Sequence, residues 1–423
     1  MLGSFGSSSH DEVEEPPPPP PNVYHHHRQI HEHRSLVSPP IHMRQLLISC
    51  AELVSRSDLT AAHRLISILS TKSTPFGDST ERLVHQFTKA LSIRLSRHAA
   101  AANFFMIPSP VITSVPTIAG ASSSTSNDEA LVHSSYLSLN QVTPFVRFSQ
   151  LTANQAMLES IQGQQAIHIL DFDIMHGVQW PPLMQAVAER FPTPTLRITA
   201  TGSDLEILRR TGDRLAKFAH SLGLRFKFHP LILLTNEDPI SVTSSVLILP
   251  DEALAVNCMH YLHRLLKNRD SVRLFLHRIK AMNPIVFTVA EREANHNHPF
   301  FQQRFVEALD HYAAVFESLE ATLPPNSRER QALEQIWFGK EITDIVAAEG
   351  ENRRERHERF RSWEIMLRSS GFLNVPLSPF AVSQAKLLLR LHYPSEGYQL
   401  RSLNNSLFLG WQNQPLFSVS SWH

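Results

Sequence analysis

Five short β-rich runs alternate with helical patterns in the middle of the chain, and this alternation constrains the fold more than any other feature. Strands joined by helical crossovers run parallel in one sheet, so we predict an α/β fold with a mostly parallel sheet. The first run is apolar on both faces apart from His168, as expected of a central strand. The expected strands are 166–172, 195–201, 224–230, 245–250 and 284–291, and the expected helices between them lie near 180–190, 203–222, 251–267 and 271–281.

Helical spacing of apolar residues predicts further helices on both sides of this region. Ser57 and Asp58 interrupt the first pattern and predict a helix cap. A Pro/Ser/Thr-rich segment over 107–128 predicts a surface loop, and the final segment from Leu389 predicts a strand pair that closes the sheet. The remaining expected helices cover 41–100 in three pieces, then 129–140, 143–162, 299–320, 328–348 and 354–370.

Residues 1–41 predict a disordered tail, because they hold a proline run and a histidine-rich run with few apolar residues. The histidines at 25–27, 31 and 33 offer metal ligands, but nothing in such a segment fixes their geometry. We therefore predict a polar tail without a metal site.

Composition excludes several classes of protein. Lys plus Arg is 39 and Asp plus Glu is 39, and this balance argues against broad phosphate binding. The two cysteines, Cys50 and Cys258, lie in apolar, helix-like surroundings and cannot form a disulfide framework or a Cys-rich zinc site. No secretory signal and no apolar run of about 18 residues is visible. A soluble intracellular protein is expected.

Two acids, Asp171 and Asp173, stand at the carboxyl end of the first strand, where open α/β sheets bind ligands. A dinucleotide or S-adenosylmethionine site needs a glycine-rich turn here, but only Gly177 is present, and Asp204 is better explained as a helix cap. We predict no cofactor. The two acids would face the same side of a strand and could share a proton or hold a cation. We favour the interpretation that they accept hydrogen bonds from nearby loop amides.

The segment 290–301 offers a second polar group at the same sheet edge. It resembles a metal site in composition but lacks a helical His-x-x-x-His pair, so we predict a polar loop. No nucleophile elbow and no cysteine–base pair is visible. The sequence therefore predicts neither a metal site nor a catalytic residue. The residues concerned are Glu291, Glu293, His296 and His298.

The basic segment 352–361 interleaves arginines with glutamates, which predicts a solvated, ion-paired helix face. The alternative is a phosphate-contacting face formed by Arg353, Arg354, Arg356, Arg359 and Arg361.

Two further patterns are typical of partner-binding helices. Residues 203–222 contain a short a/d seam broken by Gly212, and 262–266 has L-x-x-L-L spacing. For both we favour packing in the core.

Taken in order, these motifs resemble those of the plant GRAS-domain family of transcriptional regulators over residues 42–423. The leucine-rich blocks correspond to 42–100 and 203–222, and 341–372 corresponds to the region around the family's R-V-E motif. The family's V-H-I-I-D motif corresponds to Ile167, His168, Ile169, Leu170 and Asp171, its P, F-Y and R-E positions to Pro284, Phe305, Tyr312, Arg328 and Glu329, and its S-A-W motif to Ser420, Ser421 and Trp422.

The resemblance implies a methyltransferase-like, Rossmann-like core with an α-helical cap subdomain. The cap would comprise mainly 42–162, including the 107–128 loop, and the α/β core would comprise 163–423, with helices of 299–370 partly contributing to the cap. It also implies a nuclear regulator that acts with zinc-finger transcription factors and other GRAS proteins, as a homo- or heterodimer, with indirect or weak DNA contact and no membrane. The opening "MLGSFGSSS" resembles the Lateral suppressor branch, which implies a role in axillary meristem initiation.

We therefore predict a non-enzymatic transcription co-regulator. Three rival functions stay open: a sequence-specific DNA binder using the five arginines, a methyltransferase, and a small-molecule receptor whose pocket candidates are Asp171, Asp173 and Glu291. The tryptophans are expected to anchor the core, and they are Trp180, Trp337, Trp363, Trp411 and Trp422.

Overall fold

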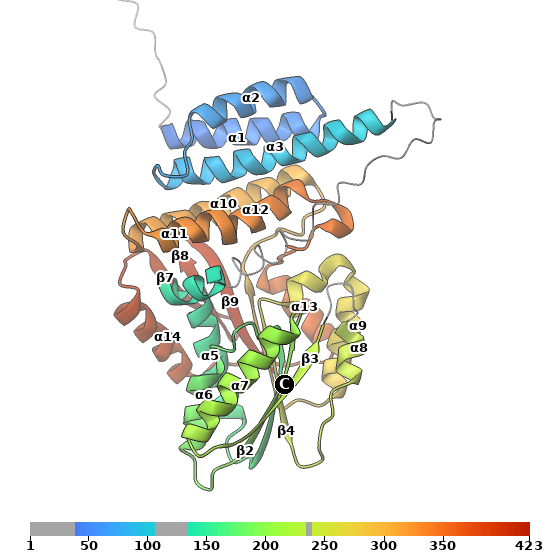
Figure 1. The fold of residues 1–423 in the computed structure, drawn as a ribbon, viewed down its shortest axis with the longest axis vertical. Helices are drawn as coiled ribbons and strands as arrows, with labels where there is room; N and C mark the ends of the chain where they lie inside the picture. The colour runs from blue at the N-terminus through green and yellow to red at the C-terminus, as the bar shows by residue number, and fades with distance from the viewer. Residues whose placement is uncertain (1–38, 106–133, 234–238) are drawn as a thin grey trace, which may run out of the picture. The chain divides into compact units, whose positions relative to one another are not determined.

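The computed structural model describes residues 39–105, 134–233 and 239–423, and residues 39–423 form one compact unit. Most of the predicted tail and the whole predicted 107–128 loop lie outside the described residues. A nine-stranded sheet organises this unit, with helices against both faces and a further layer of helices beyond one end (Figure 1). None of the described helices is long and apolar enough to cross a membrane.

The sheet has a parallel part and an antiparallel part, in the order β3-β2-β1-β4-β5-β9-β8-β7, with β6 paired to β9. The chain runs from β1 outward to β3 and then returns to β4 on the other side of β1, so the topological switch point lies between β1 and β4. This confirms the predicted α/β, Rossmann-like, mostly parallel sheet. The parallel strands are β1 (Ala166–Phe172), β2 (Thr195–Gly202), β3 (Arg225–Ile232), β4 (Ala253–Met259) and β5 (Val286–Arg292), and the antiparallel ones are β6 (Asn374–Val375), β7 (Tyr398–Leu403), β8 (Ser406–Trp411) and β9 (Gln414–Trp422).

The fourth strand does not lie where the sequence predicted it. The expected strand 245–250 has turns and irregular structure, and the expected helix 251–267 contains β4 followed by the 3-10 helix η1 (Leu262–Lys267). Six of the seven β4 residues are buried, so the strand shows no polar–apolar alternation and its pattern fits a buried helix equally well. Cys258 therefore lies on a central strand rather than on a helix.

Each face of the sheet has its own apolar core. On one face Ile169 packs with α5, α6 and α7, and on the other Leu170 packs with α9 and α13. Helix α7 packs against the sheet through Leu208 and Leu215, which confirms core packing as the explanation of its a/d spacing. The helices around the two cores are α5 (Pro144–Ser160), α6 (Trp180–Ala188), α7 (Leu205–Ser221), α9 (Arg269–Ala281) and α13 (Phe360–Ser369), and the short α8 (Pro239–Ser244) packs on α9.

The helical cap predicted with the fold class is present as a layer in which α1 and α3 pack on α10, α3 also packs on α12, and α2 packs on α1 and α3 (Figure 1). Its apolar side chains belong to the same core as those of β8 and β9, so the cap and the antiparallel end of the sheet share one interior. The predicted N-terminal capping of a helix by Asp58 is also confirmed, because the Asp58 side chain accepts a hydrogen bond from Ala61 N at the start of α2. The layer comprises α1 (Pro39–Ser55), α2 (Leu59–Thr71), α3 (Ser79–Phe105), α10 (Phe301–Thr322) and α12 (Phe338–Ala347).

Several elements differ from the expected ones. The helix predicted over 354–370 begins only at Phe360, the one over 328–348 contains a π-helical turn, and the C-terminal strand pair is a set of three strands preceded by an unpredicted helix. A helix over 134–142 precedes α5. The additional elements are α11 (Arg328–Ala332), η2 (Leu333–Trp337), η3 (Gly350–Asn352) and α14 (Pro379–His392).

Four of the five tryptophans are buried as predicted, while Trp337 is only partly buried. Trp422 is fully buried on β9, and its Nε1 donates to Ser420 Oγ at 2.8 Å.

Trp422→Ala would leave a large cavity beside Phe360 and is expected to lower the free energy of unfolding by about 3–5 kcal/mol. Urea unfolding measures this loss, and the exposed Phe76→Ala change should alter stability by less than about 0.5 kcal/mol. Equal effects of the two changes would contradict the burial argument.

Gly212 allows α7 to approach β3. A Cβ atom at this position would lie 2.4 Å from the Phe228 ring, so an alanine forces the ring or the helix to move. Gly212→Ala is expected to lower stability by about 1–2 kcal/mol, although alanine favours the helix, since overpacking costs more than the propensity gains. Thermal unfolding should show a partial recovery in the Gly212→Ala/Phe228→Leu double variant. A more stable single variant would contradict this.

Candidate functional site at the carboxyl edge of the sheet

The carboxyl ends of β1, β4 and β5 meet beside the switch point, where open α/β sheets usually bind ligands. In this chain these ends carry buried polar side chains that bond to one another, in two groups. The Asp171 row comprises Asp171, Gln179, Trp180, Asn257 and Thr288. The histidine cluster comprises His263, Glu291, His296, Glu355 and His357.

The Asp171 row crosses three strands, because Asp171, Asn257 and Thr288 occupy matched register positions on β1, β4 and β5. Asn257 Nδ2 donates to Asp171 Oδ1 at 2.7 Å, and Thr288 Oγ1 donates to Asn257 Oδ1 at 2.9 Å. Trp180 Nε1 donates to Asp171 Oδ2 at 2.9 Å, and Gln179 exchanges two bonds with Asn257. Both Asp171 oxygens are thus occupied, although by side chains rather than by the loop amides that we expected.

Burial raises the pKa of Asp171 to about 7, because the charged carboxylate is separated from water, and the hydrogen bonds from Asn257 and Trp180 offset only part of this effect. Ionisation of the Asp171 carboxyl therefore costs free energy. This favours a structural role for the Asp171 row over a role in binding a cation.

Backbone amides of the loop after β1 donate hydrogen bonds within the protein. Asp173 N donates to Thr201 Oγ1 at 2.9 Å, Ile174 N to Thr201 O at 3.1 Å and Gly177 N to Ile174 O at 2.8 Å. A phosphate group would need such N–H groups to be free. Asp173 adopts a left-handed conformation with φ 67°, so β1 ends before it and the expected alternation with Asp171 does not apply. These three amides of the loop are therefore committed to the protein itself.

Other residues predicted near this loop also have internal roles. Gly177 has φ 60°, and a Cβ atom there would lie 2.8 Å from Thr211 Cγ2, so this glycine lets the loop approach α7. The Asp173 carboxylate pairs with Arg264. Asp204 caps α7 by accepting from two backbone amides, as predicted.

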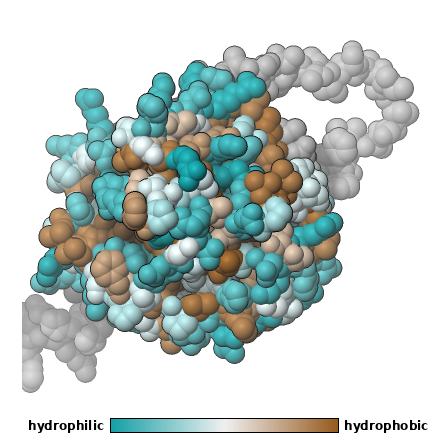
Figure 2. All heavy atoms as spheres, turned by 90° about the horizontal axis from the view of Figure 1, so that it is seen from below, coloured by the Kyte–Doolittle hydropathy of each residue, from teal (hydrophilic) through white to brown (hydrophobic). Residues whose placement is uncertain are grey.

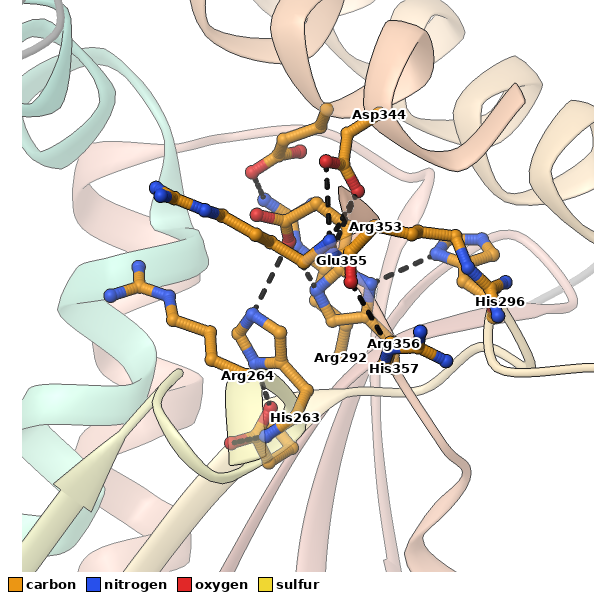
Figure 3. Close-up of polar contacts among 12 residues, drawn as sticks. His263, Arg264, Arg292, His296, Asp344, Arg353, Glu355, Arg356 and His357 are labelled. Carbon is orange, nitrogen blue, oxygen red and sulfur yellow. Dashed lines mark hydrogen bonds and ion pairs between the residues drawn. The ribbon is translucent and has the colours of Figure 1, made fainter. Parts of the chain in front are cut away.

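The histidine cluster lies where η1, the end of β5 and the extended segment before α13 meet (Figure 3). His263 Nδ1 lies 2.8 Å from Glu291 Oε2, and its Nε2 lies 3.2 Å from Glu355 Oε2. His357 Nε2 is also 3.2 Å from Glu355 Oε2, while its Nδ1 lies 3.0 Å from His296 Nδ1. Three imidazoles and two carboxylates are thus joined in one buried chain of contacts.

The charges in this cluster favour different protonation states for the histidines. Burial alone would lower the pKa of His263, but the adjacent Glu291 and Glu355 outweigh it and raise the pKa to about 9. Burial and neighbouring positive groups hold the pKa values of His296 and His357 well below the usual range. Glu291 and Glu355 thus stabilise a positive charge on the His263 imidazole.

The three pocket candidates do not come together. Successive residues of a strand point to opposite faces, so Glu291 lies on the face opposite to Thr288, and Thr288 shares its face with Asp171. Asp171 bonds within its row, Asp173 pairs with Arg264, and Glu291 pairs with His263. Each candidate carboxylate therefore has its own internal partner.

The histidine cluster was not predicted from the sequence, because its members come from three distant segments. We expected His263 on a helix, Glu355 and His357 on a solvated helix face, and His296 in a polar loop. The signal was the i, i+2 spacing of Glu355 and His357, which places both on one side of an extended segment. Of the other predicted loop residues, Glu293 accepts from Phe360 N, and His298 accepts from Phe300 N.

The cap closes this edge of the sheet. Arg292 at the end of β5 pairs with Glu341 of α12 at 2.5 Å, and Tyr312 of α10 donates to the same carboxylate at 2.9 Å. Asp344 of α12 accepts from the backbone amides of Arg354 and Glu355. These contacts fix the extended segment between the cap and the sheet.

The expected basic helix face over 352–361 is wrong, because residues 353–359 are extended and partly interior. Arg353 donates to His296 O and Arg356 to Asn297 Oδ1, and both are buried. Arg354, Arg359 and Arg361 are exposed. The five arginines therefore do not form one surface.

Most family-motif positions lie in the interior. Arg328 and Glu329 are exposed at the start of α11, and Glu329 accepts from Ser327 Oγ. The remaining positions are buried on β1, before β5, on α10 and on β9; they are Ile167, His168, Ile169, Leu170, Asp171, Pro284, Phe305, Tyr312, Ser420, Ser421 and Trp422.

A hollow of about 460 Å³ lies at the opposite, amino-terminal edge of β1 and β2, lined by residues that include Gln165, Arg190 and Pro194. Figure 2 shows the molecule from below, with hydrophobic residues in small separate groups among hydrophilic ones.

These features define a Rossmann-like α/β protein with a helical cap, in which the protein's own side chains occupy the usual ligand edge. Residues 43–423 match the GRAS domain family, and the chain belongs to this family. It is similar to Scarecrow-like protein 18 of Arabidopsis thaliana, with 53% identity over 90% of this chain and 91% of that protein, and to MONOCULM 1 of Oryza sativa, with 43% identity over 90% and 88%. The crystal structure of SCL7 from Oryza sativa has 33% identity and a TM-score of 0.74, covering 92% of this chain and all of that one. The chain is thus a member of a family of plant transcriptional regulators.

The titration of Asp171 should be visible in stability. The folded protein holds this proton up to about pH 7 whereas the unfolded chain releases it near pH 3.8, so this group destabilises the fold as the pH rises through that window. Asp171→Asn cannot titrate. Its amide nitrogen faces a donor where Asp171 accepts a hydrogen bond, which lowers its stability at every pH, but its stability relative to wild type should rise across the window by at most about 4 kcal/mol, at about 1.4 kcal/mol per pKa unit. Urea unfolding across pH tests this, with exposed Asp251→Asn as control. Parallel curves for Asp171→Asn and wild type would contradict it.

Proposed function

We propose that this protein is a non-enzymatic nuclear co-regulator of transcription that acts through protein partners. The observation that carries the proposal is the closed carboxyl edge, where Asp171 is bonded on both oxygens and the β1 loop amides bond internally. An enzyme or receptor that used this edge would have to break these bonds before it could hold a ligand. Membership of the GRAS family supports the regulatory role.

Because some arginines of the basic segment 352–361 are buried and others are exposed, protein partners are favoured over direct DNA binding. Arg353 and Arg356 make internal hydrogen bonds and Arg359 pairs with Glu307, so at most two of the five arginines remain available for phosphates. In contrast, α14 exposes Phe380, Leu387 and Leu391 at helical spacing. Exposed apolar side chains on one face are typical of protein contacts. The partners we propose are transcription factors, including zinc-finger ones, and other GRAS chains.

The biological setting that we propose is axillary meristem initiation. The sequence resembles the Lateral suppressor branch, and its identity is higher to Scarecrow-like protein 18 and MONOCULM 1 than to the SCARECROW proteins of rice, which share 36%. This order of identities supports a role shared with the first two relatives rather than with SCARECROW.

Calorimetry with the purified full chain separates these functions. S-adenosylmethionine at millimolar concentration should give no binding heat, because the loop amides that would hold it are engaged. Titration with promoter DNA should show only weak affinity that falls steeply with salt. Saturable S-adenosylmethionine binding, or tight sequence-specific DNA binding, would overturn the proposal.

Promoter occupancy in cells tests the positive claim. A tagged chain should be nuclear and should crosslink to its target promoters only while the partner transcription factor is present. Removing that factor is expected to abolish crosslinking without changing the level of the chain. Occupancy that persists after each co-purifying transcription factor has been removed would favour direct DNA binding instead.

A further inference from the structure

We propose that His263, Glu355 and His357 form a binding site for a divalent transition-metal cation of the zinc type, held in place by Glu291 and His296. One ligand atom from each of the three side chains lies within 4.8 Å of the other two, and we assign these atoms as His263 Nε2, Glu355 Oε2 and His357 Nε2. Two imidazoles and one carboxylate are a ligand set that zinc commonly takes, with a fourth position left for water.

The separations in the site suit such an ion. Both Nε2 atoms lie 3.2 Å from Glu355 Oε2. Ligands about 2.1 Å from a tetrahedral zinc ion are about 3.4 Å apart, so these two contacts already have the required spacing. The two imidazole rings face each other with centroids 4.2 Å apart and an interplanar angle of 30°. Because the two rings are nearly parallel, the His357 ring must turn about its Cβ–Cγ bond before both nitrogen lone pairs point at one ion.

Both Nε2 atoms face the same carboxylate. His263 Nε2 and His357 Nε2 are buried and make no hydrogen bond of normal geometry, although each faces the Glu355 carboxylate. A protonated His263 directs one N–H at Glu291 and the other at Glu355. A divalent cation between the two Nε2 atoms and Glu355 would replace the proton on His263 Nε2 and would bind both histidines together.

The groups behind the ligands complete the arrangement. Metal-bound histidines usually donate their second N–H to a carboxylate or another acceptor, which fixes the tautomer. Glu291 accepts from His263 Nδ1 at 2.8 Å, and His296 Nδ1 lies 3.0 Å from His357 Nδ1. Both histidines therefore have an acceptor on the side away from Glu355.

The surrounding charges allow the ion to enter. Arg264 pairs with Asp173 and Arg292 with Glu341, so the nearby positive groups are each matched by a carboxylate outside the site. The Glu355 side chain is 18% exposed, whereas the two histidines are almost fully buried. Glu355 thus gives the site its route to solvent.

A bound ion would add a link between parts of the fold that lie far apart in the sequence. His263 lies on η1 after β4, while Glu355 and His357 lie on the segment that α12 holds through Asp344. The ion would therefore fasten the cap-side segment to the sheet edge. This role is structural and is independent of the proposed regulatory function.

The histidine-rich tail would also collect metal, so the test starts from the full chain with its tail histidines changed to serine, namely His10, His25, His26, His27, His31 and His33. After exposure to Zn²⁺ and dialysis, elemental analysis should find about one zinc per chain. The melting temperature should be higher with Zn²⁺ than with EDTA, since a ligand of the folded state stabilises it. Co²⁺ substitution should give the visible absorption of a four-coordinate site. Absence of stoichiometric zinc, or equal melting temperatures, would overturn the proposal.

Matched variants locate the ion. Glu291→Gln should weaken zinc affinity about 10–100-fold, and Glu355→Gln should weaken it more. Glu334→Gln removes a buried carboxylate that pairs with Arg82 and not with the cluster, so it should lower the melting temperature while leaving the zinc-dependent increment unchanged. Equal zinc affinity in the tail variant and in its Glu355→Gln derivative would overturn the assignment. The zinc content and melting temperature of the tail variant need no change in the cluster. They therefore test the proposal even if a cluster variant misfolds.

Discussion

The buried carboxyl group of Asp171 is the constraint on which the centre of this structure depends. It lies at the end of the central strand, and water cannot reach it, so every unpaired oxygen would cost free energy. Asn257 and Trp180 satisfy it, and Asn257 in turn requires Thr288 and Gln179. The row therefore fixes three strands in register and holds the start of α6 against them. A ligand could occupy this position only by displacing that set of bonds.

The same edge shows how the cap and the sheet depend on each other. Arg292 ends a sheet strand, but its carboxylate partner Glu341 belongs to the cap. Glu355 faces the sheet through His263, while its backbone amide is bonded to Asp344 of the cap. Breaking one partner of such a buried pair leaves an uncompensated charge. The cap is thus joined to the sheet by charged contacts as well as by a continuous apolar core, which favours a regulatory scaffold with a closed interior.

The parallel strands next to β1 were predictable, because β-branched and aromatic residues are concentrated in them and helical patterns separate them. The exception is β4, whose Ala253, Ala255 and Cys258 carry no strong β signal and are buried on both sides. The site was predicted only in part. Asp171 and Glu291 stand at strand ends and were identified. His263 and His357 were not, because they are 94 positions apart in the sequence and periodicity carries no information about such a contact.

The sequence by itself determined the layered α/β class, the lack of a glycine-rich turn after β1 and the motifs that mark the family. These are local properties, set by side-chain spacing and backbone preference within a few residues. Only the tertiary structure decided where the charges go: Arg353 and Arg356 turn inward, Glu291 and Asp171 face opposite sides of the sheet, and three histidines meet two glutamates. Such choices follow from the balance between desolvation and pairing, and that balance exists only once distant segments have been brought together.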